Sequence, residues 1–286
     1  MTKPTIQYAD ESTCQIRLFK APQPDTTLLL ILPAMGVKAS YYETFGQALN
    51  HAGYHVLIAD WRGHGDSAIR PSRKVDFGYQ DLIDDIGAMV AYATEQFPQS
   101  KKIIVGHSLG GQLGSLFMAK EPNAIEGIVL ITACSVYYKG WEKGWRMKVL
   151  GAGYFFPMIS QIIGYFPGHQ IGFAGKEAQT VIKDWCHNAL TGQYKPKGSL
   201  FDYEKALSLL KKKVLAFSIQ GDDLAPPIAL EYLTNKYHPD APIKRHHLTL
   251  EDTGLKKLTH FSWAKTPAYI VTKIQEWDQQ RYGVKN

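Results

Sequence analysis

Cysteine is scarce in this chain, and its thiols form no recognisable site. The 286 residues include only Cys14, Cys134 and Cys186, and no two of them stand in a Cys-x-x-Cys pair. This spacing excludes the common zinc and thioredoxin-like motifs, so we expect no metal and no cofactor. An odd number of widely separated thiols is typical of a reducing compartment, which predicts a cytoplasmic protein.

Long apolar segments are also missing. The longest apolar run lies around residues 28–32, far below the roughly 18 residues that a membrane span needs. Residues 1–5 lead into no apolar signal region, which predicts a chain without a secretion signal. We therefore expect no stable membrane insertion.

Positive charge is in slight excess but is not concentrated. The chain has 32 Lys and Arg against 26 Asp and Glu, a formal net charge of +6. The densest basic run, residues 211–213, is short and is typical of a solvated face. Because no nucleic-acid-binding motif accompanies the charge, we expect no nucleic-acid partner.

Strand and helix patterns alternate along the first 134 residues. Apolar runs between turn residues predict strands, and apolar residues at helical spacing predict helices. The predicted strands are 14–20 (half exposed), 27–32, 54–59, 102–105 and 127–133, and the predicted helices are 40–52, 78–97 and 108–120. This order predicts an α/β fold with a mostly parallel sheet and helices on both faces.

The pattern changes between residues 135 and 210, which are rich in aromatics and glycine and show no comparable strand. Two further strands are predicted at 214–219 and 243–250, and a last helix at about 267–280. We predict one α/β core, residues 1–134 and 211–286, with an inserted cap, residues 135–210. In residues 149–173, two prolines (Pro157 and Pro167) and five glycines argue against one continuous amphipathic helix and favour a cap over a pocket.

One serine stands in the pattern of a catalytic nucleophile. Residues 106–110, Gly-His-Ser-Leu-Gly, match G-x-S-x-G between a buried strand and a helix. Such a tight turn strains the backbone of Ser108, and the flanking glycines remove Cβ atoms that would clash. The alternative is a serine that only caps the helix in a glycine-rich turn.

A serine hydroxyl needs a base to take its proton, and histidine has a suitable pKa. His260 lies between the last predicted strand and the last helix, where this architecture places the base. His246 and His247 lie inside a predicted strand, and His107 should point away from Ser108. We predict that His260 is the base.

The third catalytic group should orient the imidazole, and it should follow the strand 214–219. Asp222 and Asp223 both lie there, and neighbouring side chains cannot both reach His260. Two backbone N–H groups should stabilise the oxyanion. We expect them at Leu109 and, in the loop of residues 33–36, at Met35, although Met35 also fits a simple core role.

These motifs resemble the α/β-hydrolase superfamily, with an inserted helical cap, over nearly the whole chain. Residues 60–67, Asp-Trp-Arg-Gly-His-Gly-Asp-Ser, are similar to a loop of its lipase-, esterase- and lysophospholipase-like branch. Residues 222–226, Asp-Asp-Leu-Ala-Pro, and 164–168, Gly-Tyr-Phe-Pro-Gly, resemble a narrower group of predicted bacterial α/β hydrolases. We expect the loop of residues 60–67 to brace the site.

Two departures from the family pattern affect the site. Pro33-Ala34 stands where the oxyanion motif usually has His-Gly, and Gly221 directly precedes the Asp pair. Asp222 keeps the usual spacing to a following proline, so it ranks first as the acid and Asp223 second.

The resemblance implies a serine hydrolase that cleaves a carboxylic ester, or a related acyl bond, through an acyl-enzyme. The aromatic cap implies a small-molecule substrate with an apolar acyl or aromatic group. Two alternatives remain open: an acyltransferase that uses the same acyl-enzyme, and a non-catalytic ligand-binding protein with this fold.

Overall fold

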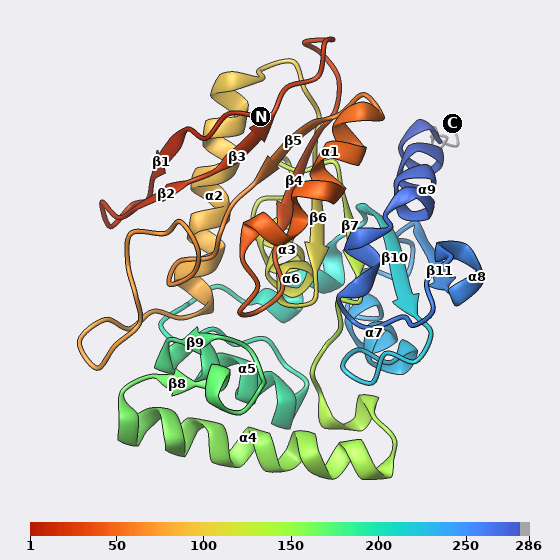
Figure 1. Ribbon diagram of the computed structural model, residues 1–286. Helices are drawn as coiled ribbons and strands as arrows, with labels where there is room; N and C mark the ends of the chain where they lie inside the picture. The colour runs from red at the N-terminus through yellow and green to blue at the C-terminus, as the bar shows by residue number, and fades with distance from the viewer. Residues whose placement is uncertain (281–286) are drawn as a thin grey trace.

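A seven-stranded sheet forms the centre of the computed structural model, which describes residues 1–280 (Figure 1). The strand order is β11-β10-β7-β6-β4-β5-β3, and every neighbouring pair is parallel except β3 with β5. The strands are β3 (Arg17–Phe19), β4 (Leu28–Leu32), β5 (His55–Ile58), β6 (Lys102–His107), β7 (Gly127–Ile131), β10 (Lys213–Ile219) and β11 (Ile243–Leu248). The predicted α/β fold with a mostly parallel sheet is confirmed.

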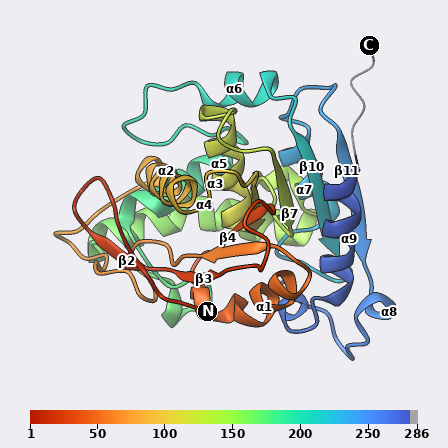
Figure 2. The same cartoon turned by 90° about the horizontal axis from the view of Figure 1, so that it is seen from above.

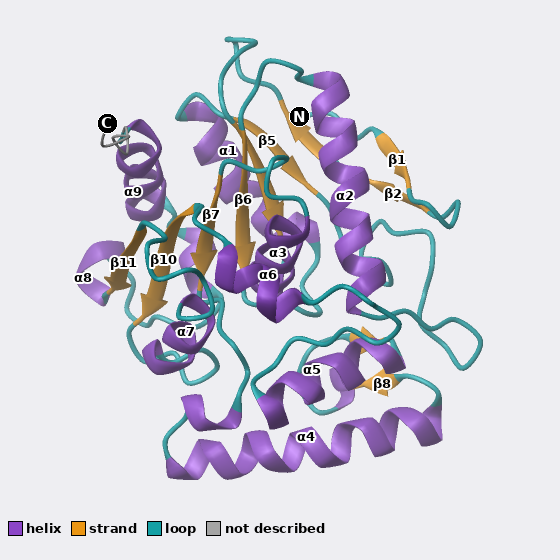
Figure 3. Cartoon of the chain, turned by 180° about the vertical axis from the view of Figure 1, so that it is seen from behind, coloured by secondary structure: helices purple, strands orange, loops and turns teal. Residues whose placement is uncertain are grey.

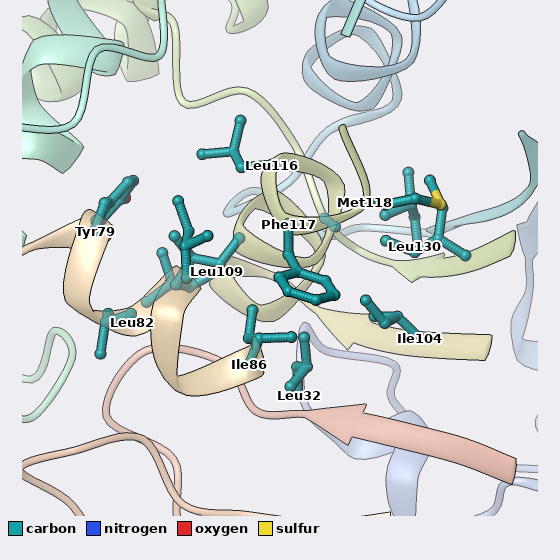
Figure 4. Close-up of a cluster of buried hydrophobic side chains, with 14 of the residues drawn as sticks. Leu32, Tyr79, Leu82, Ile86, Ile104, Leu109, Leu116, Phe117, Met118 and Leu130 are labelled. Atoms are coloured by element: carbon teal, nitrogen blue, oxygen red, sulfur yellow. The ribbon is translucent and has the colours of Figure 1, made fainter. Parts of the chain in front are cut away.

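Helices cover both faces of this sheet, which is why its central strands are apolar throughout. One face carries α2 (Tyr79–Gln96), α3 (Leu109–Lys120), α6 (Tyr203–Leu209) and α7 (Pro227–Thr234), and the other carries α1 (Glu43–His51) and α9 (Ala268–Gln279). Figure 2 shows α1 on the opposite side of β4 from α2 and α3, and Figure 3 shows α2, α3 and α6 together. In Figure 4, Ile86 and Phe117 of these helices lie next to Leu32 and Ile104 of the sheet.

The predicted single strand at 14–20 is wrong. β2 (Thr13–Gln15) pairs with β1 (Thr5–Gln7) in a separate two-stranded sheet, whereas β3 forms the edge of the main sheet and is fully buried. In a half-exposed strand, Arg17 would point to solvent. It is buried instead, because carboxylates form ion pairs with it. Its guanidinium lies 2.6 Å from Glu43 and 3.0 Å from Asp66.

The segment between β7 and β10 crosses the carboxyl ends of the strands. It contains α4 (Lys143–Ile163), β8 (Phe166–Pro167), β9 (Lys176–Glu177), α5 (Gln179–Thr191) and α6; α8 (Leu250–Thr253) follows β11. Figure 1 shows α4 and α5 below the ends of the strands, with α4 outermost. No helix in the described part of the chain is long and apolar enough to cross a membrane.

As expected, residues 149–173 do not form one continuous helix, but the break lies at Gly164 and not at Pro157. α4 runs unbroken through Pro157 and ends at Gly164. Gly153 does not end the helix but allows α4 to pack closely against α5. A Cβ atom at Gly153 would lie 2.7 Å from the side chain of Leu190 on α5. Tertiary packing against α5 therefore stabilises α4 despite the backbone hydrogen bond that Pro157 cannot donate.

A buried ion pair fixes α2 to the loop that follows β5. Arg62 donates from Nε to Oδ2 of Asp85 on α2 at 2.6 Å, and from Nη1 to Asp10 at 2.7 Å. The side chains of Arg62 and Asp85 are almost fully buried. This pair gives the loop of residues 60–67 a rigid attachment to the core.

We expect Asp85→Ala to lower the free energy of unfolding by about 3 kcal/mol, because it leaves the Arg62 charge buried with a weaker set of partners. The neighbouring Asp84 is half exposed and forms a surface pair with Lys120 at 2.8 Å, so Asp84→Ala is the matched control. It should change stability by about 0–1 kcal/mol. Urea denaturation measures both free energies of unfolding. Equal losses of stability in the two variants would contradict the role assigned to the Arg62–Asp85 pair.

Candidate active site

Ser108 lies in the sharp turn between β6 and α3, at the carboxyl end of the sheet. Its backbone is strained, with φ 52° and ψ −115°. Two glycines make the turn possible: a Cβ atom on Gly106 would lie 2.4 Å from Gly111, and one on Gly110 would lie 2.1 Å from the carbonyl oxygen of Leu32. The Ser108 N–H donates to the Ile131 carbonyl at 3.1 Å, which ties the turn to β7.

His260 is hydrogen-bonded to a buried carboxylate. Its Nδ1 lies 2.8 Å from Oδ2 of Asp222, although the two residues are far apart in the sequence. Oδ1 of Asp222 accepts N–H groups of Leu224 and Ala225 at 3.0 and 3.3 Å. With Nδ1 as the donor to the carboxylate, Nε2 of His260 is left as a proton acceptor, a tautomer inferred from these bonds.

Asp223 is placed differently from its neighbour. Its side chain is exposed, and its backbone carbonyl accepts the indole N–H of Trp141 at 2.8 Å. Of the two acidic candidates, only Asp222 contacts His260 in the structure.

His107 connects the loop of residues 33–36 to the backbone of His260. The Tyr42 hydroxyl accepts the Ala34 N–H at 2.9 Å and lies 2.7 Å from Nδ1 of His107. Nε2 of His107 lies 3.0 Å from the carbonyl oxygen of His260, which also accepts the indole N–H of Trp263 at 3.1 Å.

The protonation state of His107 follows from its surroundings. Burial holds the pKa of His107 well below its usual range, and the neighbouring His260 lowers it further, so the ring is neutral. Since Tyr42 already accepts from Ala34, its hydroxyl proton is free to go to Nδ1 of His107, and Nε2–H then donates to His260. Sequence reasoning expected only that His107 points away from Ser108 and missed this connection.

A cavity of about 450 Å³ lies above Ser108. Ser108, Leu109, Met35 and His260 line its floor on the core side. No hydrogen bond from the N–H of Met35 or of Leu109 is found among residues 1–280. Neither amide is therefore committed to a protein acceptor within the described residues.

The opposite wall of the cavity is one face of α4. Trp145, Val149, Ala152 and Phe156 line it at intervals of three or four residues. Phe173 and Trp185 extend this apolar wall. These residues have helical spacing in the sequence. A helical cavity wall is nevertheless not predicted there, because Pro157 is expected to interrupt the helix.

A second ion pair holds the inserted segment against the core beside the cavity. His64 Nε2, from the loop of residues 60–67, lies 3.0 Å from Oε2 of the buried Glu177. Oε1 of Glu177 accepts the Gly175 N–H at 3.1 Å. A Cβ atom on Gly36 would lie 2.3 Å from the nitrogen of Gly175, so this pair sits directly behind the loop that carries Met35.

Comparisons with known proteins support the fold. The family described as serine aminopeptidase, S33, matches residues 23–154, which include the turn at Ser108 but not Asp222 or His260. Est1E from Butyrivibrio proteoclasticus, solved with ferulic acid bound, superposes with a TM-score of 0.68, covering 97% of this chain and 100% of Est1E at 16% identity. The chain therefore shares its fold with Est1E, and its residues 23–154 are similar to the S33 family.

Two sequence relatives, a lysophospholipase and a monoglyceride lipase, each match part of this chain. Lysophospholipase L2 of Escherichia coli K12 is 30% identical over 116 residues, which cover 39% of this chain and 34% of that protein. Monoglyceride lipase of Rattus norvegicus is 26% identical over 149 residues, 52% of this chain and 48% of the lipase. The chain thus spans between a third and a half of the length of these relatives.

The His64–Glu177 pair predicts a pH-dependent contribution to stability. Burial disfavours the charged imidazole, but the Glu177 carboxylate outweighs it and raises the pKa of His64 above its usual 6.5. The contribution is therefore complete below the ordinary pKa and is lost as the pH rises through the raised pKa. We expect Glu177→Gln to destabilise the protein more at about pH 6 than at about pH 9 in urea denaturation.

The exposed His169→Asn, in the same inserted segment, serves as the control and should show no such trend. If the loss of stability caused by Glu177→Gln stays constant or grows with pH, His64 and Glu177 do not form a charged pair.

Proposed function

We propose that the protein is a serine hydrolase that cleaves a carboxylic ester, or a related acyl bond, through a Ser108–His260–Asp222 triad. The observation that carries the proposal is a strained serine at the end of a central strand, facing the same cavity as a histidine already hydrogen-bonded to a buried carboxylate. The match of residues 23–154 to the S33 family and the two relatives, a lysophospholipase and a monoglyceride lipase, support the same reaction class.

In the first half of the reaction, Ser108 Oγ attacks the acyl carbon while His260 Nε2 takes the hydroxyl proton. Asp222 keeps the ring in the required tautomer and stabilises the imidazolium that forms. The N–H groups of Met35 and Leu109 would donate to the oxyanion; loss of one such donor typically costs about 10²–10³ in kcat. His260 then protonates the leaving oxygen and the acyl-enzyme remains.

In the second half, water attacks the acyl-enzyme. His260 takes a proton from the water, the second tetrahedral intermediate collapses, and His260 returns the proton to Ser108. The products are the free acid and the alcohol released in the first half.

We also propose that residues 135–210 act as a cap on a core formed by residues 1–134 and 211–286. The apolar wall on α4 supports a substrate with an apolar acyl or aromatic group, because such a cavity offers few polar partners. The names of the relatives, lysophospholipase and monoglyceride lipase, are consistent with lipid esters.

Ser108→Ala should abolish turnover of p-nitrophenyl esters, assayed from acetyl to palmitoyl. We expect a loss on the order of 10⁴–10⁶-fold, because no other group on the cavity floor replaces the nucleophile. The wild type should show one preferred chain length and covalent labelling by a fluorophosphonate probe, which Ser108→Ala lacks. Absence of both turnover and labelling in the folded wild type would favour a ligand-binding protein instead.

Asp222→Asn should lower kcat by on the order of 10³–10⁴-fold, because an amide no longer fixes the tautomer of His260 or stabilises its charge. Asp223→Asn, one residue along, is the matched control and should keep turnover close to that of the wild type. Steady-state kinetics on the preferred ester measures both. The reverse ranking would assign the acid to Asp223.

A further inference from the structure

The outer face of α4 carries a row of exposed apolar side chains. Five of them, spaced so that they share one side of the helix, are more than half exposed: Met147, Tyr154, Phe155, Met158 and Ile162. Ile162 reaches 72% exposure. We call these five residues the outer stripe of α4.

The outer stripe lies opposite the cavity wall on the same helix. Trp145, Val149, Ala152 and Phe156 face the cavity, so α4 is apolar on both sides. A helix that is apolar all round is normally buried. In Figure 1, α4 lies along the lower edge of the molecule, and the exposures of its outer stripe show that the stripe faces solvent.

Positive charges outnumber the exposed Glu142 and Asp76 around the outer stripe. Residues 143–176 contain four Lys and Arg residues, Lys143, Arg146, Lys148 and Lys176, and no Asp or Glu. At the other end of α4, the exposed Arg73 donates to the carbonyl of Ile162, and the exposed Lys74 follows it.

Most of the nearby carboxylates are engaged. Glu177 is buried against His64, and Asp76 accepts the N–H and hydroxyl of Thr180 at 2.8 and 2.7 Å. Glu142, just before α4, is exposed and is outnumbered by the three cations of the first turns of the helix. The outer stripe is therefore an apolar strip with cations at both ends.

We propose that the outer stripe of α4 adsorbs reversibly to the surface of an anionic phospholipid bilayer. An apolar face with aromatic residues, flanked by Lys and Arg, is the composition of helices that lie in the headgroup region. A second copy of the chain fits less well, because a two-fold contact through this strip would bring its cations together.

The same orientation brings the cavity to the lipid. Lys148 and Ile171 line the cavity and are also exposed, so the cavity lining reaches the surface at α4 and at residue 171. An apolar substrate would pass from the bilayer into the cavity with little exposure to water. The adsorption itself needs no catalysis, so its test is independent of the proposed function.

The test is flotation of the full chain with vesicles of phosphatidylcholine alone or with about a third phosphatidylglycerol. The variants are Phe155→Gln with Ile162→Gln, and Lys143→Glu with Arg146→Glu. The control is Leu209→Gln on α6, where an equally exposed apolar residue lies far from the stripe. None of these side chains lines the cavity.

We expect the wild type, the Leu209→Gln control and Ser108→Ala to float with the anionic vesicles, and less so as salt rises. The apolar and the charge-reversal double variants should each bind at least about tenfold more weakly. Turnover of a short, water-soluble ester should stay unchanged in the apolar double variant, which shows that the site is intact.

Three results would overturn the proposal. They are a wild type that binds no anionic vesicle, vesicle binding that the stripe substitutions leave unchanged, and a dimer, detected by light scattering, that the apolar double variant dissociates. The last result would assign the outer stripe to a second copy of the chain.

Discussion

The close approach of β6, α3 and β4 around Ser108 is the constraint on which the rest of the site depends. The turn exists because Gly106 and Gly110 leave room for Gly111 and for the Leu32 carbonyl, and because β6 is held between β4 and β7. A positive φ at a non-glycine residue is unfavourable by itself and persists only where the surroundings over-determine it. Here the surroundings are the buried centre of the sheet, so the nucleophile candidate has one position.

A chain of hydrogen bonds extends this rigidity to residues that lie far apart in the sequence. Ala34, Tyr42 and His107 connect the loop beside Met35 to the carbonyl of His260. The chain depends on a neutral His107, because only the neutral ring accepts at one nitrogen and donates at the other. Burial supplies that condition by lowering the pKa of His107. The loop that carries Met35 and the backbone of His260 are thus positioned by the same buried imidazole.

In the segment between β7 and β10, one helix, α4, forms two apolar surfaces. The inner face of α4 completes the cavity, and the outer stripe meets solvent between two groups of cations. The His64–Glu177 pair ties this segment to the loop of residues 60–67, which Arg62 and Asp85 in turn fix to α2. The wall of the cavity is therefore linked to the core by buried charges and not only by apolar contact.

The sequence by itself determined the α/β order, the position of Ser108 and the loops that carry His260 and Asp222, because each depends on a local pattern of a few residues. Tertiary structure decided the rest. Asp222 and Asp223 are adjacent and chemically identical, so the sequence does not show which of them contacts His260. That contact depends on how their loop meets the loop of His260. Arg17 is buried because three carboxylates surround it, and α4 continues through Pro157 because α5 supports it. In each of these cases the deciding free energy comes from residues distant in the sequence.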